Sequence, residues 1–249
     1  MTNQLTGKVA LVTGGSRGIG AAIARRLAKD GADVAFSYAA SPERAEQVVK
    51  EIESHGVRGF AVKADQGDAG QVVRLVTSVH EHFGRLDILV NNAGSYVTGA
   101  VDDAAADIAA FDRQFAVNVK GVATAVRTAA PLLTDGGRVI SIGTIFASRS
   151  PIPGIGDYAA SKAAVAAYTR SWARDLGPRG ITVNVIQPGA INTEMNPETG
   201  DHASMLVALA ALGRYGQPDE IAGVAAFLAG PDASYVTGAT INVDDGHLT

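Results

Sequence analysis

Tyr158 and Lys162 are the two residues whose types and spacing best suit acid–base chemistry. They lie four positions apart on a predicted helix, so their side chains share one face about one turn apart. A phenol titrates near pKa ~10. An ammonium about 4 Å away, at an effective dielectric constant of about 20, would stabilise the phenolate by roughly 4 kcal/mol, equivalent to about three pKa units. We therefore expect the pKa of Tyr158 to lie close to physiological pH, where proton transfer is most effective.

A glycine-rich segment suits phosphate binding. It reads Gly14-Gly15-Ser16-Arg17-Gly18-Ile19-Gly20 and follows a short apolar stretch. Glycines let a strand turn sharply into a helix and let the backbone approach a pyrophosphate at the helix N-terminus. The same letters also match the G-x-S-x-G nucleophile elbow of α/β-hydrolases. That alternative needs an earlier strand to supply an oxyanion loop, and no strand is predicted before residue 8.

The second strand should decide which nucleotide binds. Enzymes that use NAD usually place an acid about 20 residues past the glycines, where it binds the ribose hydroxyls. This chain has Ser37 and Tyr38 there, without a carboxylate, and Arg17 in the glycine loop can meet a 2′-phosphate with its planar fork. We therefore expect NADPH to be favoured over NADH. Ser37 and Ser41 could add hydroxyl contacts or face solvent.

The element that follows the third strand should reach the adenine. Asp65 is placed to accept a hydrogen bond from the adenine amine, with Gln66 beside it. The alternative for Asp65 is a cap of the helix that begins near Asp68.

Strands and helices must alternate to position these residues. Strands are predicted at 8–13, 33–38, 58–63, 86–91, 138–142, 181–186 and 240–243. Helices are predicted from residue 18 to about 30, and at 42–55, 68–83, 104–133, 158–176 and 218–228. This alternation predicts an α/β fold, a doubly wound parallel sheet of the Rossmann type, in a single domain over residues 1–249. A lid insertion is expected at about 191–215.

Four predicted loops converge on one edge of that sheet. Ligands of such sheets bind beyond the carboxyl ends of the strands. The glycine loop and residues 91–94, 143–144 and 188–189 all follow strands. This convergence is the strongest indication from the sequence that the edge is a binding site.

Composition narrows the class of protein. The chain has 249 residues, of which 47% are hydrophobic and 18% charged, with a net charge of −4. A large core is expected, and the absence of a basic run argues against a nucleic acid partner. Without cysteine, thiol catalysis and Cys-ligated zinc are excluded. No apolar run approaches ~18 residues, so we expect no membrane partner and a cytoplasmic location. The histidines, His202 and His247 included, are expected to be surface or structural residues, with no metal site.

Together these motifs resemble one family. They are Thr13-Gly14, Gly18-Ile19-Gly20, Asp65, Asn91-Asn92-Ala93-Gly94, Asn118, Tyr158 with Lys162, and Pro188-Gly189. On these residues the chain resembles the short-chain dehydrogenase/reductase family over essentially its whole length. Residues 212–218 and 235–238 resemble in particular the 3-oxoacyl-[acyl-carrier-protein] reductases.

The resemblance implies an NADP(H)-dependent oxidoreductase that acts on a carbonyl or secondary alcohol. Tyr158 would exchange a proton with the substrate oxygen, and Lys162 would bind the nicotinamide ribose and lower the tyrosine pKa. Asn118 would hold a water that links Lys162 to solvent. Further cofactor contacts are implied for Asn92, Ala93, Gly94, Pro188, Gly189, Ile191 and Thr193.

One position departs from the family pattern. Where the family has a serine that hydrogen-bonds the substrate oxygen, this chain has Thr144, fourteen residues before Tyr158. Threonine keeps a hydroxyl donor, although its methyl group restricts the rotamers. Ser141 is the alternative, but strand alternation would point it into the sheet. Asp157 is expected to be the N-cap of the helix that carries Tyr158.

Specificity and assembly are the least determined features. Ser95, Tyr96, Ile145, Phe146 and residues 152–155 should line the substrate side, under the lid. With only Arg149 as a basic residue in these segments, a small or mildly apolar carbonyl compound is expected. The helix after Tyr158 is apolar nearly all round, which fits the homotetramer that the resemblance implies. A nucleotide-binding regulator or scaffold that has lost catalysis is the alternative function.

Overall fold

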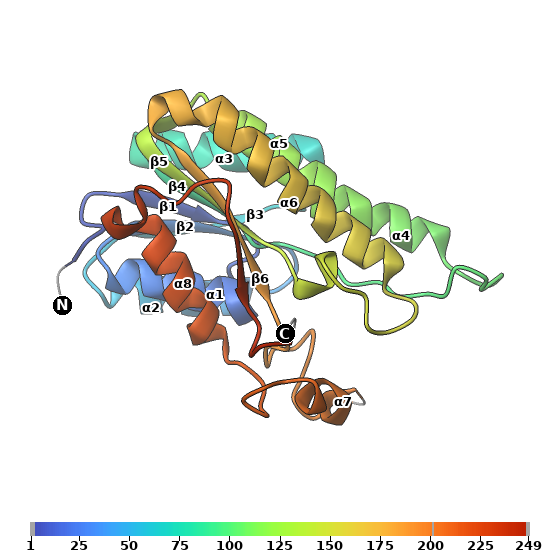
Figure 1. Cartoon of the computed structure of the whole chain (residues 1–249). Helices are drawn as coiled ribbons and strands as arrows, with labels where there is room; N and C mark the ends of the chain where they lie inside the picture. The colour runs from blue at the N-terminus through green and yellow to red at the C-terminus, as the bar shows by residue number, and fades with distance from the viewer. Residues whose placement is uncertain (1–2, 201, 248–249) are drawn as a thin grey trace.

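The computed structural model describes residues 3–200 and 202–247 and contains a seven-stranded parallel sheet in the order β3-β2-β1-β4-β5-β6-β7 (Figure 1). The strands are β1 (Val9–Val12), β2 (Asp33–Tyr38), β3 (Gly59–Lys63), β4 (Leu86–Asn91), β5 (Leu133–Ile142), β6 (Thr182–Pro188) and β7 (Thr240–Val243). The α-helices are α1 (Gly18–Lys29), α2 (Pro42–Glu53), α3 (Ala69–Phe83), α4 (Ile108–Phe115), α5 (Val122–Ala129), α6 (Gly156–Leu176), α7 (Ala203–Ala208) and α8 (Pro218–Ala229). The predicted doubly wound parallel sheet is confirmed.

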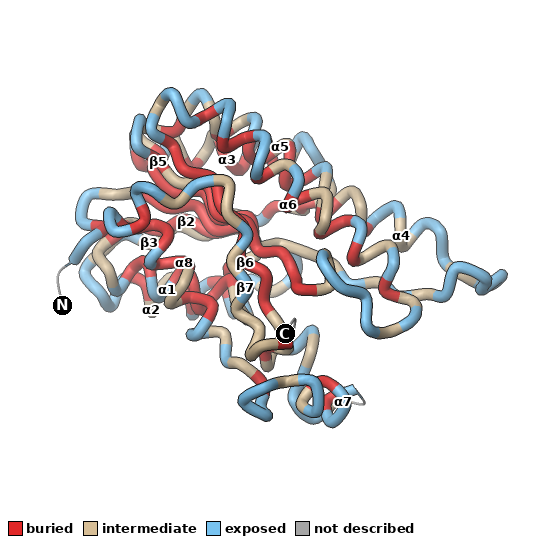
Figure 2. The backbone as a smooth tube through the Cα atoms, in the orientation of Figure 1, coloured by how far each residue is buried: buried red, intermediate tan, exposed pale blue. Residues whose placement is uncertain are grey.

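The central strands are apolar because helices cover both of their faces. Every residue of β1 and of β4 is buried, as expected for parallel strands between two helical layers. One apolar core packs α1, α2 and α8 against the sheet, and a second packs α3, α5 and α6 against the opposite face (Figures 1 and 2). β1 pairs with both β2 and β4, so the strand order reverses there. That reversal is the switch point at which such sheets bind ligands.

The region predicted as helical over 104–133 contains three helical parts. The α-helix α4 is followed by a π-helical segment, Ala116–Gly121, and then by α5. β5 begins at Leu133, earlier than the predicted residue 138, because Leu133 pairs with Leu86 before the register shifts and Arg138 pairs with Ile88. The chain makes this excursion through Gly136, whose φ of 75° lies in the left-handed region that glycine adopts without strain.

Neither residue considered as a helix cap caps its helix. The alternative role of Asp65 as the cap of α3 is wrong, because Asp68 caps this helix and its side chain accepts a hydrogen bond from the Gln71 amide at 3.1 Å. Asp157 is not a cap. α6 begins one residue before it, with Ile155 at the N-cap position and no side-chain hydrogen bond. Asp157 lies in the first turn, where its charge is favourable toward the helix dipole.

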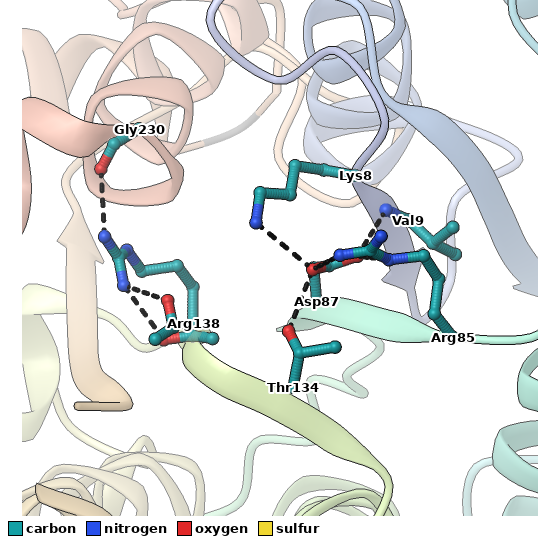
Figure 3. A network of polar contacts seen from close by, with 9 residues as sticks. Lys8, Val9, Arg85, Asp87, Thr134, Arg138 and Gly230 are labelled. Atoms are coloured by element: carbon teal, nitrogen blue, oxygen red, sulfur yellow. Dashed lines mark hydrogen bonds and ion pairs between the residues drawn. The ribbon is translucent and has the colours of Figure 1, made fainter. Parts of the chain in front are cut away.

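A buried carboxylate joins three strands at the amino edge of the sheet (Figure 3). The Asp87 side chain is 2% exposed and accepts hydrogen bonds from the Val9 amide at 2.9 Å, the Thr134 hydroxyl at 2.8 Å and the Arg85 guanidinium at 2.7 Å. Lys8 Nζ adds an ion pair at 3.3 Å. Burial raises the pKa of Asp87, but hydrogen bonds from Arg85, Val9 and Thr134 outweigh it, so the pKa lies below its usual value. The network ties the starts of β1 and β4 to β5.

Within residues 3–200 and 202–247, no helix is both long and apolar enough to cross a membrane.

Candidate active site

A cavity of about 750 Å³ lies at the carboxyl edge of the sheet, where the four predicted loops meet. Its lining contains every residue predicted to contact the cofactor: Gly14, Ser16, Arg17, Gly18, Ile19, Gly20, Ser37, Tyr38, Asp65, Gln66, Asn92, Ala93, Gly94, Tyr158, Lys162, Pro188, Gly189, Ile191 and Thr193. Thr144 also lines it, whereas Asn118 is fully buried outside the lining. The structure therefore brings together residues spread over most of the chain.

Side chains from neighbouring loops brace the glycine loop. The Thr13 hydroxyl accepts hydrogen bonds from the amides of Asn92 and Ala93, both at 3.0 Å. The Asn92 side chain donates back to the carbonyls of Thr13 and Gly14, at 2.9 and 3.0 Å. The Gly14 amide donates to the Ser37 hydroxyl at 3.0 Å. Ser37 thus supports the loop, and its hydroxyl proton stays available to a ligand.

Gly15 and Gly20 have no room for a side chain, because neighbouring atoms lie too close to them. A Cβ at Gly20 would lie 2.3 Å from the Gly14 carbonyl oxygen, and one at Gly15 would lie 2.5 Å from the Phe36 side chain. Gly14 and Gly18 have φ values of 67° and 52°, in the left-handed region. The bare backbone before α1 forms the kind of cradle that holds a pyrophosphate. The site therefore fits a dinucleotide.

Asn118 lies in the π-helical segment and joins three parts of the site. Its Oδ1 accepts from the Ser95 amide at 2.9 Å, and its Nδ2 donates to the Ser95 carbonyl at 2.9 Å and to the Ser161 hydroxyl at 3.0 Å. These bonds fix the loop after β4 relative to α6. One further lone pair of Oδ1 is left, so the water expected at Asn118 stays a prediction.

Tyr158 has Thr144 and Tyr96 as its polar neighbours. Burial raises the pKa of Tyr158 to about 12, a hydrogen bond with Thr144 lowers it, and the nearby Tyr96 raises it. The rings of Tyr96 and Tyr158 meet edge to face, with centroids 4.8 Å apart. The expectation of a tyrosine pKa close to physiological pH is therefore wrong for this structure. Desolvation of the Tyr158 phenolate raises the pKa by more than the hydrogen bond with Thr144 lowers it.

Lys162 points to the sheet. Its Nζ donates to the Ile142 carbonyl at 2.8 Å, and its side chain is only 6% exposed. Burial lowers the pKa of Lys162 to about 8. A Cβ at Gly94 would lie 3.3 Å from both Lys162 Nζ and Asn118 Oδ1, so the glycine keeps the space between these polar atoms open.

The structure separates the two candidates for the serine position. Ser141 is fully buried in β5, where its hydroxyl accepts from Asn91 Nδ2 at 3.4 Å. Thr144 lines the cavity and hydrogen-bonds Tyr158. Its Oγ1 also accepts from the Phe146 amide at 3.3 Å, which fixes the side-chain rotamer. Of the two hydroxyls, only that of Thr144 reaches the cavity.

The predicted adenine end contains a cation that the sequence did not reveal. Arg113, on α4, forms an ion pair with Asp65, and a Cβ at Gly67 would collide with its guanidinium. Burial raises the pKa of Asp65, but Arg113 and the Gly67 amide outweigh it and leave the pKa lowered. Both amide atoms of the neighbouring Gln66, which is 7% exposed, have no hydrogen-bond partner among the described residues. The Gln66 side-chain amide can therefore both donate and accept hydrogen bonds to a nucleotide base.

The segment after β6 crosses the glycine loop. The Thr193 methyl group lies 3.4 Å from where a Cβ of Gly18 would be, and Glu194 pairs with Arg44 of α2 at 2.9 Å. Arg44 and Glu194 lie 150 positions apart in the sequence, so no local pattern could have revealed their contact. His202 and His247, expected to be ordinary surface or structural residues, also line the cavity. His247 is buried, and its long-range contacts had no sequence signal.

Comparisons with known proteins agree with this geometry. The family model described as Enoyl-(Acyl carrier protein) reductase matches residues 14–247. A protein of Escherichia coli (strain K12) named "Cyclic-di-GMP-binding biofilm dispersal mediator protein" is 46% identical over 96% of this chain and 96% of its own length. Among solved structures, a short-chain dehydrogenase/reductase from Serratia marcescens BCRC 10948 is 50% identical, with a TM-score of 0.96 over 99% of this chain and 100% of its own.

A second solved structure, a short-chain dehydrogenase from Burkholderia cenocepacia J2315 in complex with NADP, is 48% identical. Its TM-score is 0.96 over 99% of this chain and 100% of its own. The match therefore extends over the sheet, both helical layers and the cavity. The chain belongs to the short-chain dehydrogenase/reductase family of oxidoreductases.

Proposed function

We propose that the protein transfers hydride between NADP(H) and a carbonyl or secondary alcohol, with Tyr158 as general acid and base. The observation that carries this proposal is that Tyr158, Thr144 and Lys162 line the same cavity as the glycine loop. A nicotinamide, when bound, supplies or accepts the hydride. The side chains of this chain then have to hold the substrate oxygen and move one proton.

In the reducing direction Tyr158 gives its proton to the substrate oxygen. With a pKa of about 12 the phenol is neutral at physiological pH, and the neutral form is the one that donates. Thr144 shares a hydrogen bond with Tyr158, so its hydroxyl is placed to donate to the same oxygen. At neutral pH Tyr158 therefore holds the proton that the reducing direction needs.

Lys162 has two proposed tasks. Its ammonium would bind the ribose hydroxyls, and its charge would lower the pKa of Tyr158 when the phenolate has to form. In this structure the ammonium donates to the Ile142 carbonyl instead. Turning toward the ribose would take it away from that carbonyl, so we propose that its effect on Tyr158 depends on the bound cofactor.

The preference for NADP is proposed from Arg17. The guanidinium lines the cavity, and no carboxylate within residues 3–200 and 202–247 forms an ion pair with it. It is therefore available to a 2′-phosphate. The solved relative from Burkholderia cenocepacia is in complex with NADP, which supports the same choice.

The test is a panel of small aldehydes, ketones and secondary alcohols, assayed with NADPH and with NADH. We expect turnover with NADPH at the higher kcat/KM, and a selective loss of the NADPH reaction in Arg17→Gln. Arg74→Gln, on the exposed surface of α3, is the matched control and should behave like the wild type. Equal use of NADH by the wild type would contradict the role proposed for Arg17. No turnover across the panel would contradict the proposal that the protein catalyses hydride transfer.

A nucleotide-binding regulator without catalysis is the second candidate. It is favoured by one observation, the name of the Escherichia coli relative as a cyclic-di-GMP-binding protein. Calorimetric titration with cyclic-di-GMP and with NADPH separates the two. Micromolar binding of cyclic-di-GMP, combined with no turnover in the panel, would replace the reductase by a regulator.

Substrate class, location and assembly are also proposals. Apolar and aromatic side chains contribute to the cavity lining, among them Tyr96, Ile145, Phe146, Ile152 and Leu206. We propose a small or mildly apolar carbonyl compound, held beneath a lid formed by residues 191–215. The resemblance to 3-oxoacyl-[acyl-carrier-protein] reductases in residues 212–218 supports the reductase direction. A cytoplasmic homotetramer is proposed from the same resemblance.

A further inference from the structure

The loop after β7, residues 244–247, holds the segment that contains α7. The Ala211 amide donates to the Asp245 carbonyl at 2.7 Å, and the Leu212 amide donates to the Asp245 side chain. Asp245 has a φ of 56°, an uncommon conformation for a residue with a side chain. The backbone of the loop is therefore held in an uncommon conformation at Asp245, the residue that contacts Ala211 and Leu212.

His247 makes the most demanding of these contacts. Its Nδ1 lies 2.6 Å from the Asp244 carbonyl oxygen, and its Nε2 lies 2.9 Å from the Leu206 carbonyl oxygen. The residue is 6% exposed. Carbonyl oxygens only accept hydrogen bonds, and a neutral imidazole has one N–H donor. Both contacts are hydrogen bonds only when the ring carries two protons. In either neutral tautomer, a nitrogen lone pair would face a carbonyl lone pair.

Charged groups lie on the loop that carries this ring and on the elements that contact the loop. Asp244 and Asp245 lie on the same loop, and each has one buried carboxylate oxygen without a hydrogen-bond partner among the described residues. Arg149, from the loop before α6, donates to the His247 carbonyl at 3.2 Å, and Arg214 interacts electrostatically with Asp245. His202 and Glu194, both in the lid segment, also line the cavity.

The carbonyl that His247 contacts belongs to Leu206, a residue of α7 that lines the cavity. Leu206 and Ala203 of α7 are buried and line the cavity. They form a small cluster with Tyr215 that is separate from the two cores on the sheet. With so little apolar packing, the position of α7 depends on the polar contacts at its end.

We propose that His247, as an imidazolium, clasps the Leu206 carbonyl and so positions α7 over the substrate side of the cavity. His247 is a positioning residue, because it acts through α7. When the ring loses a proton, only one of its two nitrogens can still donate, and the hold of His247 on the Leu206 carbonyl weakens. The effect on substrate rests on the proposed reductase function, whereas the clasp itself does not.

The first test needs no substrate. Hydrogen exchange of residues 203–212 is measured in the full chain from pH 5.5 to 8.5, corrected for the intrinsic exchange rate. We expect protection to fall about tenfold as histidine deprotonates in this range, the equivalent of one hydrogen bond to a charged group. In His247→Gln, whose side-chain amide does not titrate in this range, protection should not change with pH. His55→Gln, at an exposed position, should follow the wild type.

A spectroscopic measurement covers the case in which His247→Gln does not fold. Nitrogen NMR of wild-type protein labelled with ¹⁵N-histidine should show one imidazole with both nitrogens protonated at pH 6.5. A neutral ring with one protonated nitrogen at that pH would overturn the proposal. Protection of residues 203–212 that does not change with pH would overturn it too.

The kinetic test follows on any carbonyl substrate that the panel identifies. We expect KM to rise about tenfold between pH 6 and 8 with little change in kcat, and this rise to be absent in His247→Gln. A KM that does not change with pH in the wild type would mean that α7 is not positioned through the ring. If the exchange and NMR results hold but no substrate turns over, the proposed function fails and the clasp stands.

Discussion

The two edges of the sheet bury charge in opposite ways. At the amino edge, Asp87 is surrounded by donors from Val9, Arg85 and Thr134, and its pKa lies below the usual value (Figure 3). At the carboxyl edge, Lys162 is nearly as buried but hydrogen-bonds one carbonyl, and its pKa falls to about 8. Burial is offset at one edge and left uncompensated at the other.

This difference separates stability from function. A buried charge with its partners in place adds to the stability of the fold, and removing a partner is costly. A buried ionisable group without partners costs stability, and such groups cluster at sites where a ligand or reaction uses them. Mutations at the amino edge should therefore lower the free energy of unfolding, and mutations at the carboxyl edge should lower kcat/KM.

Tyr158→Phe should have the largest effect on rate. Removing the proton donor is expected to lower kcat/KM by about 10²- to 10⁴-fold, with no loss in the free energy of unfolding, because the ring is kept. Steady-state kinetics and urea unfolding measure the two quantities. A variant that kept most of its activity would remove Tyr158 from the chemistry and with it the contrast between the edges.

Asp87→Ala should have the largest effect on stability. It leaves the buried Val9 amide without its acceptor and removes the hydrogen bonds from Arg85 and Thr134, so we expect the free energy of unfolding to fall by about 3 kcal/mol. The kcat/KM per folded molecule should be unchanged. Because the pKa of Asp87 is lowered in the fold, the stabilisation is present above the unfolded carboxyl pKa near ~3.9 and is lost as pH falls below it. A loss of activity without a loss of stability would reverse the roles of the two edges.

Thr144→Ala should lower kcat/KM by about 10²-fold, as expected when one donor to the substrate oxygen is removed. Thr144→Ser is the matched control, since it keeps the hydroxyl and should stay close to the wild type. Stability should change little in either variant. An alanine variant with most of its kcat/KM would assign the hydrogen bond to another group.

The smallest effect concerns the pH dependence of stability. The pKa of Lys162 is lowered to about 8 in the fold, against ~10.4 when unfolded. Between these values the unfolded chain binds more protons, so the free energy of unfolding should rise with pH. The rise should be absent in Lys162→Met. Urea unfolding at pH 7.5, 8.5 and 9.5 measures this rise. If the free energy of unfolding changed with pH equally in the wild type and in Lys162→Met, the burial of Lys162 would be compensated, and the contrast between the two edges would fail.

Sequence reasoning succeeded where a short motif carries the geometry. The glycine loop and Asn92 follow strands that are buried on both faces, and Lys162 lies on the helix that carries Tyr158, so their convergence could be predicted. Thr144 could be preferred over Ser141 because side chains alternate along a strand. These predictions needed only local periodicity and the rule that ligands bind at the carboxyl ends of strands.

It failed where an energy depends on distant neighbours. The pKa of Tyr158 was expected to fall because a charge lay one turn away, but the structure buries the phenol and directs Lys162 to Ile142. The Arg113–Asp65 pair joins residues 48 positions apart. Neither the direction of a flexible side chain nor the desolvation of its end group is present in a local pattern.

The π-helical segment that carries Asn118 has a consequence for how this chain can vary. A helix with one residue more per turn differs from its α-helical form by a whole residue, and each residue of an α-helix rotates the chain by about 100°. Removing one residue from Ala116–Gly121 would therefore turn α5 by that angle relative to α4, taking Val122 and Val126 off the sheet or Asn118 away from Ser161. We expect this segment to accept substitutions much more readily than changes in length.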